Sequence, residues 1–484
     1  MELGGATIVW FRQDLRLEDN PALSAAAARG GPVVPVYIWA PEEEGKWAPG
    51  AASRWWLHQS LSALDAALRP LGSRLILRRG GSLAALSGLI RECGASAVFW
   101  NRRCEPAAVT RDRKIEAALR DRGLITQSFN SALLFEPSTV LNRVGRPFQI
   151  FTPFWRACLR LQQPPRPGPS ARRPPPPGRW PRSLPLDALG LEPKTDWASG
   201  LRKVWTPGEN GAAARLRRFL RAGVAGYPGS RDRPDLPGTS GLSPHLHFGE
   251  IGPRRIWHTL QDREFRKSPG ASHRGGESFL RQLGWREFAH HLLLHFPGTA
   301  GRPLRQEFAR FPWARAPKDL AAWREGRTGY PLVDAGMREL LSTGWMHNRV
   351  RMIAASFLVK DLRIHWLEGA RWFWETLVDA DLANNTLGWQ WAAGCGADAA
   401  PYFRIFNPAL QGKKFDPGGG YVRRWVPELS GLSAAWIHEP GRAPAEALER
   451  AGVEPGKSYP APVVEHAAAR ERALAALATL KRGK

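Results

Sequence analysis

A proline- and arginine-rich segment, residues 162–185 (QQPPRPGPSARRPPPPGRWPRSLP), limits the fold of this chain more than any other feature. Proline fixes its own φ angle and lacks an N–H donor, so this segment cannot form the interior of a helix or a sheet. We interpret it as a long connection with extended stretches. The connection separates two parts of the chain whose sequence patterns differ.

Before the connection, short apolar runs alternate with helical stretches. The apolar runs are residues 7–11, 33–39, 74–77, 97–100 and 124–128, and the helical stretches are about 51–69, 82–92 and 106–121. Asn20 and Pro21 have the residue types of an N-cap and a first helical position, so a further helix is expected to begin there. This alternation predicts a doubly wound parallel sheet. No GxGxxG follows the first run, so the dinucleotide-binding fingerprint is absent.

After about residue 206, amphipathic helical patterns separated by Gly and Pro replace the alternation. The predicted fold class is therefore an α/β domain joined to an all-α domain. We expect an α/β domain at 1–130, an interdomain linker at 131–205 and a larger helical domain at 206–484. A chain of 484 residues is long enough for more than one core.

The charge of the chain indicates a polyanionic partner. Lys plus Arg number 69 and Asp plus Glu number 44, which gives a formal net charge of +25. An arginine-rich compositional drift without a partner is the alternative. Nucleic acid is favoured because the arginines lie among aromatic residues and not in a tail.

Composition also limits the compartment and the metal chemistry. No apolar run reaches the roughly 20 residues of a membrane span, and the first residues do not resemble a signal peptide. We expect a soluble cytoplasmic protein that does not bind membranes. The four cysteines show no paired spacing and are expected to be reduced core thiols. Only Cys395 lies in the second half of the chain, which excludes a four-thiolate iron–sulfur or zinc site there.

Four segments of the helical half combine polar and aromatic residues. They are residues 238–245 (GTSGLSPH), 279–288 (FLRQLGWREF), 344–352 (GWMHNRVRM) and 378–391 (VDADLANNTLGWQW). The first could present N–H and O–H donors to a phosphate, although an ordinary loop before a helix is equally compatible. The second is equally compatible with a half-buried amphipathic helix. The polar side chains of residues 378–391 would be costly to bury without partners. The four segments together favour a ligand-binding domain.

Longer motifs resemble the photolyase/cryptochrome family. They are EGRTGYPLVD (325–334), TGWMHNRVRM (343–352), LANNTLGWQWAAGCGADAAPYFRIFNP (382–408) and the opening VWFRQDLRLEDNPAL. The similarity covers nearly the whole chain and is greatest to bacterial cyclobutane pyrimidine dimer photolyases. It implies light-driven repair, in which excited reduced FAD gives one electron to a dimer flipped out of DNA.

The resemblance also implies roles for individual residues. FAD contacts are implied for Tyr227, Thr239, Ser240, Gly241, Leu242, Ser243, Gln282, Arg286, Arg351, Asp379, Ala380, Asp381 and Asn385. An electron relay is implied for Trp389, Trp366 and Trp313, while catalytic roles are implied for Gln282 and for Asn385, which matches the side chain at flavin N5. Lesion and DNA contacts are implied for Arg231, Trp285, Asn348, Arg349, Met352 and Gln411. Damaged DNA is the expected partner, held mainly through backbone phosphates, and a monomer is expected.

Two positions depart from the pattern of bacterial dimer photolyases. Gln282 stands where those proteins usually carry Glu, and Gln is typical of the (6-4) and DASH-type branches. Against the (6-4) branch, its two catalytic histidines would fall at Asn348 and Met352. Phe279, where Trp is common, keeps an aromatic ring.

Other functions stay open at this point. A cryptochrome-like light sensor would normally carry a signalling tail, but the last element here, an Ala- and Arg-rich helix at 465–480, resembles a part of the domain itself. A purely structural DNA-binding protein would not need the Asp and Asn cluster. A second, antenna chromophore, either folate or deazaflavin, would lie in the crevice at the carboxyl ends of the strands, near Asn101 and Glu105.

Overall fold

The computed structural model describes residues 5–161, 163–169, 175–262, 270–398 and 403–482. The chain forms two compact units. Unit 1 contains Met1–Ala225, Ser240–Pro297 and Val378–Leu382, and unit 2 contains Gly226–Thr239, Gly298–Leu377 and Ala383–Lys484. Three stretches of the predicted helical domain, residues 206–225, 240–297 and 378–382, therefore cluster with the N-terminal part of the chain.

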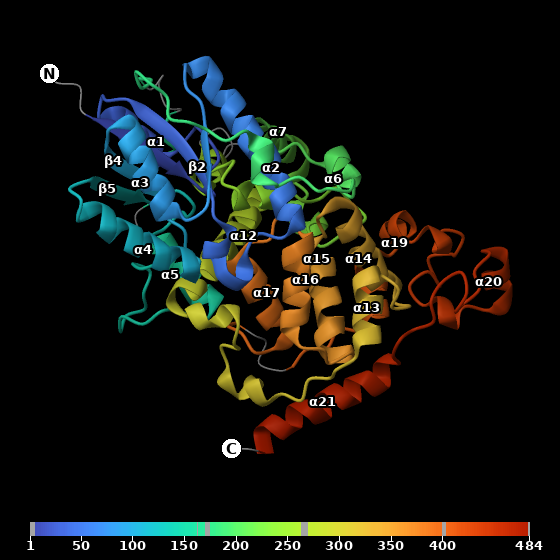
Figure 1. Ribbon diagram of the computed structural model, residues 1–484. Helices are drawn as coiled ribbons and strands as arrows, with labels where there is room; N and C mark the ends of the chain where they lie inside the picture. Colours follow the sequence, from blue (N-terminus) through green and yellow to red (C-terminus); the bar gives the residue numbers. More distant parts are fainter. Residues whose placement is uncertain (1–4, 162, 170–174, 263–269, 399–402, 483–484) are drawn as a thin grey trace. The chain divides into compact units, whose positions relative to one another are not determined.

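A five-stranded parallel sheet is the centre of unit 1, as the sequence predicts (Figure 1). Its strand order is β3-β2-β1-β4-β5. The strands are Ala6–Phe11 (β1), Val33–Trp39 (β2), Ile76–Arg79 (β3), Ala95–Asn101 (β4) and Ile125–Phe129 (β5). The helices between them are Pro21–Ala28 (α1), Ala51–Leu68 (α2), Ser82–Cys93 (α3) and Pro106–Arg120 (α4).

Local signals predict most of these elements correctly. The side chain of Asn20 accepts a hydrogen bond from the N–H of Leu23 at 3.1 Å, so the predicted N-cap of α1 is confirmed. The expected strand 74–77 is wrong by two residues. The N–H of Leu75 donates to the Asp65 carboxylate of α2 at 2.8 Å, and pairing with β2 begins only at Ile76.

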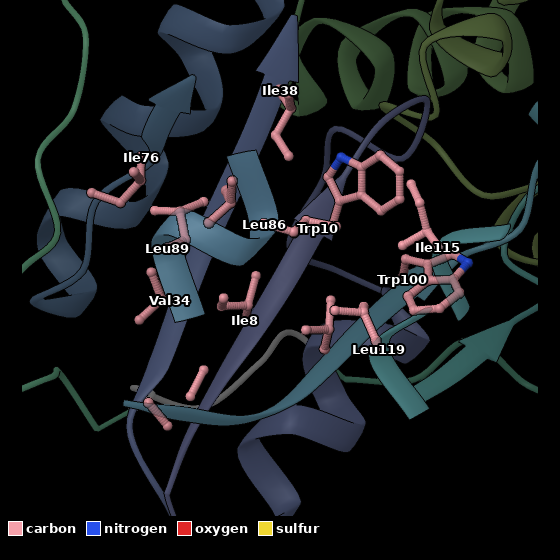
Figure 2. Packing of buried hydrophobic residues seen from close by; sticks show 14 of the residues in the cluster. Ile8, Trp10, Val34, Ile38, Ile76, Leu86, Leu89, Trp100, Ile115 and Leu119 are labelled. Atoms are coloured by element: carbon pink, nitrogen blue, oxygen red, sulfur yellow. The ribbon is translucent and has the colours of Figure 1, made fainter. Parts of the chain in front are cut away.

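In the core of unit 1, helices α3 and α4 pack against one face of the sheet (Figure 2). Alternate strand residues point to this face because side chains alternate along a strand. They include Ile8, Trp10, Val34 and Trp100, and they meet Leu86, Leu89, Ile115 and Leu119 of the helices. This packing fixes the carboxyl ends of β1 and β4, where a crevice is expected.

Further helices complete unit 1. They are Phe151–Arg160 (α5), Ser199–Val204 (α6), Glu209–Arg218 (α7), Ser243–His247 (α9), Pro253–Gln261 (α10) and Gly270–His295 (α12). Glu287 on α12 is 3% exposed, and its Oε2 accepts bonds from the N–H groups of Leu134 and Phe135 at 2.9 and 3.2 Å. This carboxylate joins α12 to the chain that follows the sheet. Residues 163–169 and 175–185 contain neither helix nor strand.

Unit 2 is helical in its described residues. Its helices are Tyr227–Ser230 (α8), Pro317–Glu325 (α13), Pro331–Thr343 (α14), Asn348–Ser356 (α15), Trp366–Thr376 (α16), Leu382–Ala393 (α17), Pro408–Phe415 (α18), Gly420–Trp425 (α19), Ala445–Arg450 (α20) and His466–Arg482 (α21). Helix α14 packs against α13, α15, α18 and α19. The last helix begins and ends slightly later than the expected 465–480.

The cysteines and the helix lengths complete the description. Cys158 and Cys395 are buried, but Cys93 and Cys104 are only half-buried, so the expectation of four core thiols is wrong for two of them. Across the ranges that the structure describes, no helix is both long enough and apolar enough to cross a membrane.

Candidate functional site

A short loop in unit 1, Ser240–Ser243, leads into helix α9, which begins at Ser243. The N–H of Leu242 donates to Ser240 Oγ at 3.3 Å, and Gly241 has φ +63°, which favours glycine. A Cβ atom at Gly241 would lie 2.6 Å from Arg215 Nη1, so a guanidinium lies directly against this loop. Small residues beside a cation suit an anionic group such as a phosphate.

Arg215 itself could not be singled out from the sequence, because it lies in the ordinary basic run RLRR of α7. Its Nη2 donates to the carbonyl of Val204 at 2.7 Å, and its guanidinium lies 4.2 Å from the centre of the Trp205 ring. Burial, together with Arg218, lowers the pKa of Arg215 to about 10. It is therefore a cation at neutral pH.

A buried carboxylate with two imidazoles forms the second part of the site in unit 1. Asp381 is 8% exposed, and its Oδ2 lies 3.4 Å from His290 Nε2 and 3.9 Å from His247 Nδ1. Burial alone would raise the pKa of Asp381. The electrostatic attraction of His290 and His247 outweighs burial and holds this pKa well below its usual range.

The geometry of His290 fits the charged form of its ring. Its Nδ1 lies 3.0 Å from the carbonyl oxygen of Arg286, which can only accept, and its Nε2 faces the Asp381 carboxylate. Burial lowers the pKa of His290, but the attraction of Asp381 raises it above the usual value. Asp381 is thus an ionised hydrogen-bond acceptor, and neither histidine was singled out from the sequence.

Helix α12 carries three of the predicted site residues. Arg286 Nη1 donates to the carbonyl of Ala132 at 2.6 Å, so this arginine is held in place by the chain after β5. Gln282 is half-buried, and its Nε2 lies 3.4 Å from the carbonyl of Ser278. Trp285 stacks face to face on Phe151, with ring centroids 3.8 Å apart. One face of the indole is therefore covered, and bases could stack only on the other.

A recess in unit 1 brings some of the predicted residues together. It is lined, among others, by Asn101, Glu105, His247, Arg286 and Asp381. Asn101 and Glu105 are engaged in internal contacts there. Asn101 Nδ2 donates to Asp14 Oδ2 at 2.5 Å and to Asn20 Oδ1 at 2.8 Å, and Glu105 lies 3.1 Å from Arg103. Asn101 and Glu105 are therefore bonded to other protein groups at the carboxyl ends of the strands.

In unit 2, the first five residues of α15 include four predicted site residues. Asn348 is exposed, and its Nδ2 lies 3.8 Å from Met352 Sδ one turn later. Arg349 pairs with Asp232 at 3.0 Å and lies 4.4 Å from the centre of the Phe415 ring. Arg351 Nε donates to the carbonyl of Met346 at 2.7 Å. The turn thus presents a polar, basic face beside a thioether.

The three predicted relay tryptophans also lie in unit 2. Trp389 is 2% exposed and contacts Phe373 and Trp323, with ring centroids 5.0 and 6.1 Å away. The His365 ring lies between the other two, 5.0 Å from Trp313 and 5.7 Å from Trp366. Burial lowers the pKa of His365, so its ring is neutral. Neither His365 nor Trp323 was singled out from the sequence.

The remaining predicted residues are placed as follows. Asn385 Nδ2 donates to the carbonyl of Ala370 at 3.0 Å, which leaves its second N–H and its Oδ1 for a ligand. Tyr227 is 6% exposed, and the Arg231 guanidinium lies 6.0 Å from its ring centre. Gln411 lies on α18 and Thr239 precedes the Ser240–Ser243 loop. Asp379 and Ala380 are buried beside Asp381.

These residues fit FAD by the chemistry of their donors and acceptors. The Ser240–Ser243 loop with Arg215 suits the pyrophosphate, because it combines hydroxyls with a cation. The ionised Asp381 suits a hydrogen-bond donor on an uncharged ring, because it can only accept. In unit 2, the free hydrogen-bonding capacity of Asn385 suits a ring edge.

Comparison with known proteins identifies two family models in this chain. The model described as DNA photolyase matches residues 7–173, and the model described as FAD binding domain of DNA photolyase matches residues 279–479. Together they match more than half of the chain. The curated "Deoxyribodipyrimidine photo-lyase" of Agrobacterium fabrum is 49% identical over 476 residues, 98% of each chain.

Two further proteins show the range of these similarities. "Cryptochrome-1" of Arabidopsis thaliana is 44% identical over 95% of this chain and 68% of its own length. The crystal structure of a bacterial class III photolyase from Agrobacterium tumefaciens superposes with a TM-score of 0.95 at 48% identity, over 100% of this chain and 98% of that one.

Proposed function

Since the chain belongs to the DNA photolyase family, we propose that it repairs cyclobutane pyrimidine dimers in DNA by light-driven electron transfer. As a member of this family it is a DNA-repair photo-lyase, its cofactor is FAD and its substrate is damaged DNA. The observation that favours the dimer is the first turn of α15. Asn348 and Met352 occupy the two positions where the (6-4) branch carries its histidines.

The FAD contacts that we propose are the residues whose motifs match those of the family. They are Ser240, Gly241, Leu242, Ser243, Gln282, Arg286, Asp379, Ala380 and Asp381, and also Tyr227, Thr239, Arg351 and Asn385. When bound, reduced FAD supplies an electron to the lesion under light. Asp381 stays ionised through its imidazole partners and accepts a hydrogen bond, and Trp389, Trp366 and Trp313 relay electrons from the surface.

The net charge of +25 and the lesion residues support the proposed DNA binding. Arg231 and Arg349 contact the backbone without reading its sequence, together with Gln411. A dimer pairs poorly with the opposite strand, so less free energy is needed to flip it out than to flip normal bases. Trp285, Asn348 and Met352 then receive the flipped bases, and the indole of Trp285 offers them one face.

A light-sensing function is the second candidate, because plant cryptochromes are similar over nearly the whole chain. Repair of defined oligonucleotides under near-UV light separates the candidates. We expect the FAD-loaded protein to restore cyclobutane dimers in duplex DNA. Repair of (6-4) products only, or of single strands only, would assign it to another branch, and repair of neither lesion would favour the sensor.

The role of Gln282 gives a first prediction. A neutral amide can donate and accept hydrogen bonds to the thymine ring, and it does not titrate. Losing one buried hydrogen bond costs about 1–3 kcal/mol, so Gln282→Ala should reduce dimer affinity or repair yield several-fold. Gln282→Glu should stay active and acquire a pH dependence, measured as repair yield against pH. An unchanged yield in Gln282→Ala would contradict this role.

The ion pair of Arg349 gives a second prediction. Asp232 holds the guanidinium at 3.0 Å and competes with any phosphate for it. Arg349→Gln should lower the slope of log affinity against log salt by about one unit without changing lesion preference. Asp232→Asn should raise affinity, because it removes the competing charge.

The measurement is a salt titration of binding to oligonucleotides with and without a dimer. Arg69→Gln is the matched control, since Arg69 directly follows α2 in unit 1, is 65% exposed and pairs with nearby Asp65. The control slope should equal that of the unmodified protein. Equal slopes for Arg349→Gln and Arg69→Gln would refute the assignment of Arg349.

A further inference from the structure

A buried glutamate in unit 2 lies at the junction of three helices. Glu339 on α14 is 9% exposed. Its Oε2 accepts a hydrogen bond from the Tyr421 hydroxyl of α19 at 2.6 Å and another from the backbone N–H of His347 at 3.1 Å. One carboxylate oxygen therefore fixes both α19 and the residue that immediately precedes α15.

His347 is the residue that starts α15. Its ring Nδ1 accepts a hydrogen bond from the N–H of Arg349 at 3.2 Å and so caps the helix. The first turn carries Asn348 and Arg349, and Met352 follows one turn later; these are the proposed lesion and DNA contacts. The bond from His347 to Glu339 consequently determines where this turn begins and how it is oriented.

The loop before His347 is tied to the same helix. Thr343 Oγ1 donates to the carbonyl of Glu339 at 2.8 Å and accepts from the N–H of Trp345 at 3.2 Å. Gly344, with φ +66°, ends α14 and allows the sharp reversal. The loop is short and bonded at both ends, so a change at the Glu339 carboxylate is transmitted to α15 directly.

The charge of Glu339 depends on groups from each neighbouring element. Burial raises its pKa to about 7, while the Tyr421 hydroxyl, the His347 N–H, Arg351 of α15 and Arg424 of α19 lower it. Burial and the neighbouring Glu339 raise the pKa of Tyr421, with a contribution from Asp416, so its hydroxyl stays a donor. Burial lowers the pKa of the His347 ring to about 4, so this ring does not titrate near neutrality.

We propose that Glu339 is a positioning residue whose ionised carboxylate, acting through His347 and Tyr421, orients the first turn of α15 for binding damaged DNA. This inference rests on the proposed function. The ionised carboxylate accepts both hydrogen bonds. Once protonated, it carries a proton of its own and accepts more weakly, so the turn loosens and affinity for the lesion falls.

The test measures affinity of the FAD-loaded protein for a dimer-containing oligonucleotide on both sides of pH 7. Affinity of the unmodified protein should rise about two- to tenfold as pH increases, with a midpoint near pH 7. A change of this size corresponds to the strengthening of one or two hydrogen bonds when Glu339 ionises. Glu339→Gln, which has the same shape but does not titrate, should lose this dependence. Tyr421→Phe should move the midpoint of the pH dependence to higher pH, because the hydrogen bond from Tyr421 lowers the pKa of Glu339.

A control separates Glu339 from another group that titrates in the same range. Burial lowers the pKa of Lys360 to about 7, and Lys360 lies in the helical turn that follows α15. Lys360→Met should leave the pH dependence of DNA affinity in place. If Glu339 had only a structural role, Glu339→Gln and Tyr421→Phe would each weaken DNA binding by the same factor at every pH.

Hydrogen exchange of the peptide covering residues 344–352 provides a readout without DNA. After correction for the chemical rate, its protection should rise through the same pH in the unmodified protein and should not do so in Glu339→Gln. If the unmodified protein fails to bind the dimer but shows this change, the proposed function is wrong and the coupling holds. If it binds the dimer and neither measurement depends on Glu339, the inference is overturned.

Discussion

Replacing Trp389 by phenylalanine is expected to abolish light-driven reduction of oxidised FAD while repair by chemically reduced enzyme survives. Phenylalanine is much harder to oxidise than tryptophan, so the relay through Trp366 and Trp313 is interrupted. Phenylalanine fills most of the volume of tryptophan, so we expect the packing against Phe373 and Trp323 to change little. The measurement is the rate of flavin bleaching under blue light with an external electron donor.

Trp323→Phe is the matched control for this substitution. Trp323 is fully buried, contacts the same Trp389 ring edge to face and lies outside the predicted relay. Both substitutions should lower the free energy of unfolding by roughly 0.5–3 kcal/mol, as is usual in a core. Only Trp389→Phe should stop photoreduction. Photoreduction at the original rate in Trp389→Phe would show that the electron takes another path.

Replacing Asp381 by asparagine should have the largest effect on stability and on FAD retention. The charged His290 ring would lose its counterion, and breaking a buried pair costs about 3–5 kcal/mol. The same change removes the proposed anionic acceptor for the cofactor. The measurements are the free energy of unfolding in urea and the ratio of flavin to protein absorbance after purification.

The loss of unfolding free energy in Asp381→Asn should depend on pH in a defined direction. The raised pKa of His290 contributes stability that is complete below its unfolded value of about 6.5 and is lost as pH rises through the folded value. The lowered pKa of Asp381 contributes stability that is present above about 3.9 and is lost as pH falls through the folded value. The difference between the two proteins should therefore be largest between about pH 4 and 6.5.

Asp232→Asn is the control for this prediction. It makes the same chemical change in a carboxylate that is 34% exposed and paired with Arg349, so it should cost at most about 1 kcal/mol. It should also leave FAD content unchanged. If Asp381→Asn is no more destabilising than this control, Asp381 is not the counterion of His290.

Sequence patterns predicted the elements that depend on local signals. The parallel sheet follows from alternating apolar runs, and the start of α1 follows from the types of Asn20 and Pro21. The start of β3 was wrong because it depends on pairing with β2, which an apolar run does not reveal. Patterns one to four residues apart are visible in a sequence, whereas pairing across the chain is not.

The same limit applies to the candidate site. The segments 344–352 and 378–391 were found because several polar residues stand close together in the sequence. The ion pair of His290 with Asp381 joins residues from different segments, and so does the contact of Arg215 with Gly241. A histidine or arginine at such a position has no local signature, and the resemblance to a family carried over only motif residues.

The stack of Trp285 on Phe151 has a thermodynamic consequence for binding. A side chain that is mobile before it meets its ligand loses rotational freedom on binding, at about 0.5–1.5 kcal/mol per immobilised group. With the two rings parallel within 9° and their centroids 3.8 Å apart, the Trp285 indole is already held in one orientation. The entropy of ordering this ring is therefore lost when the chain folds. A base that stacks on the other face of the ring binds without this entropic cost.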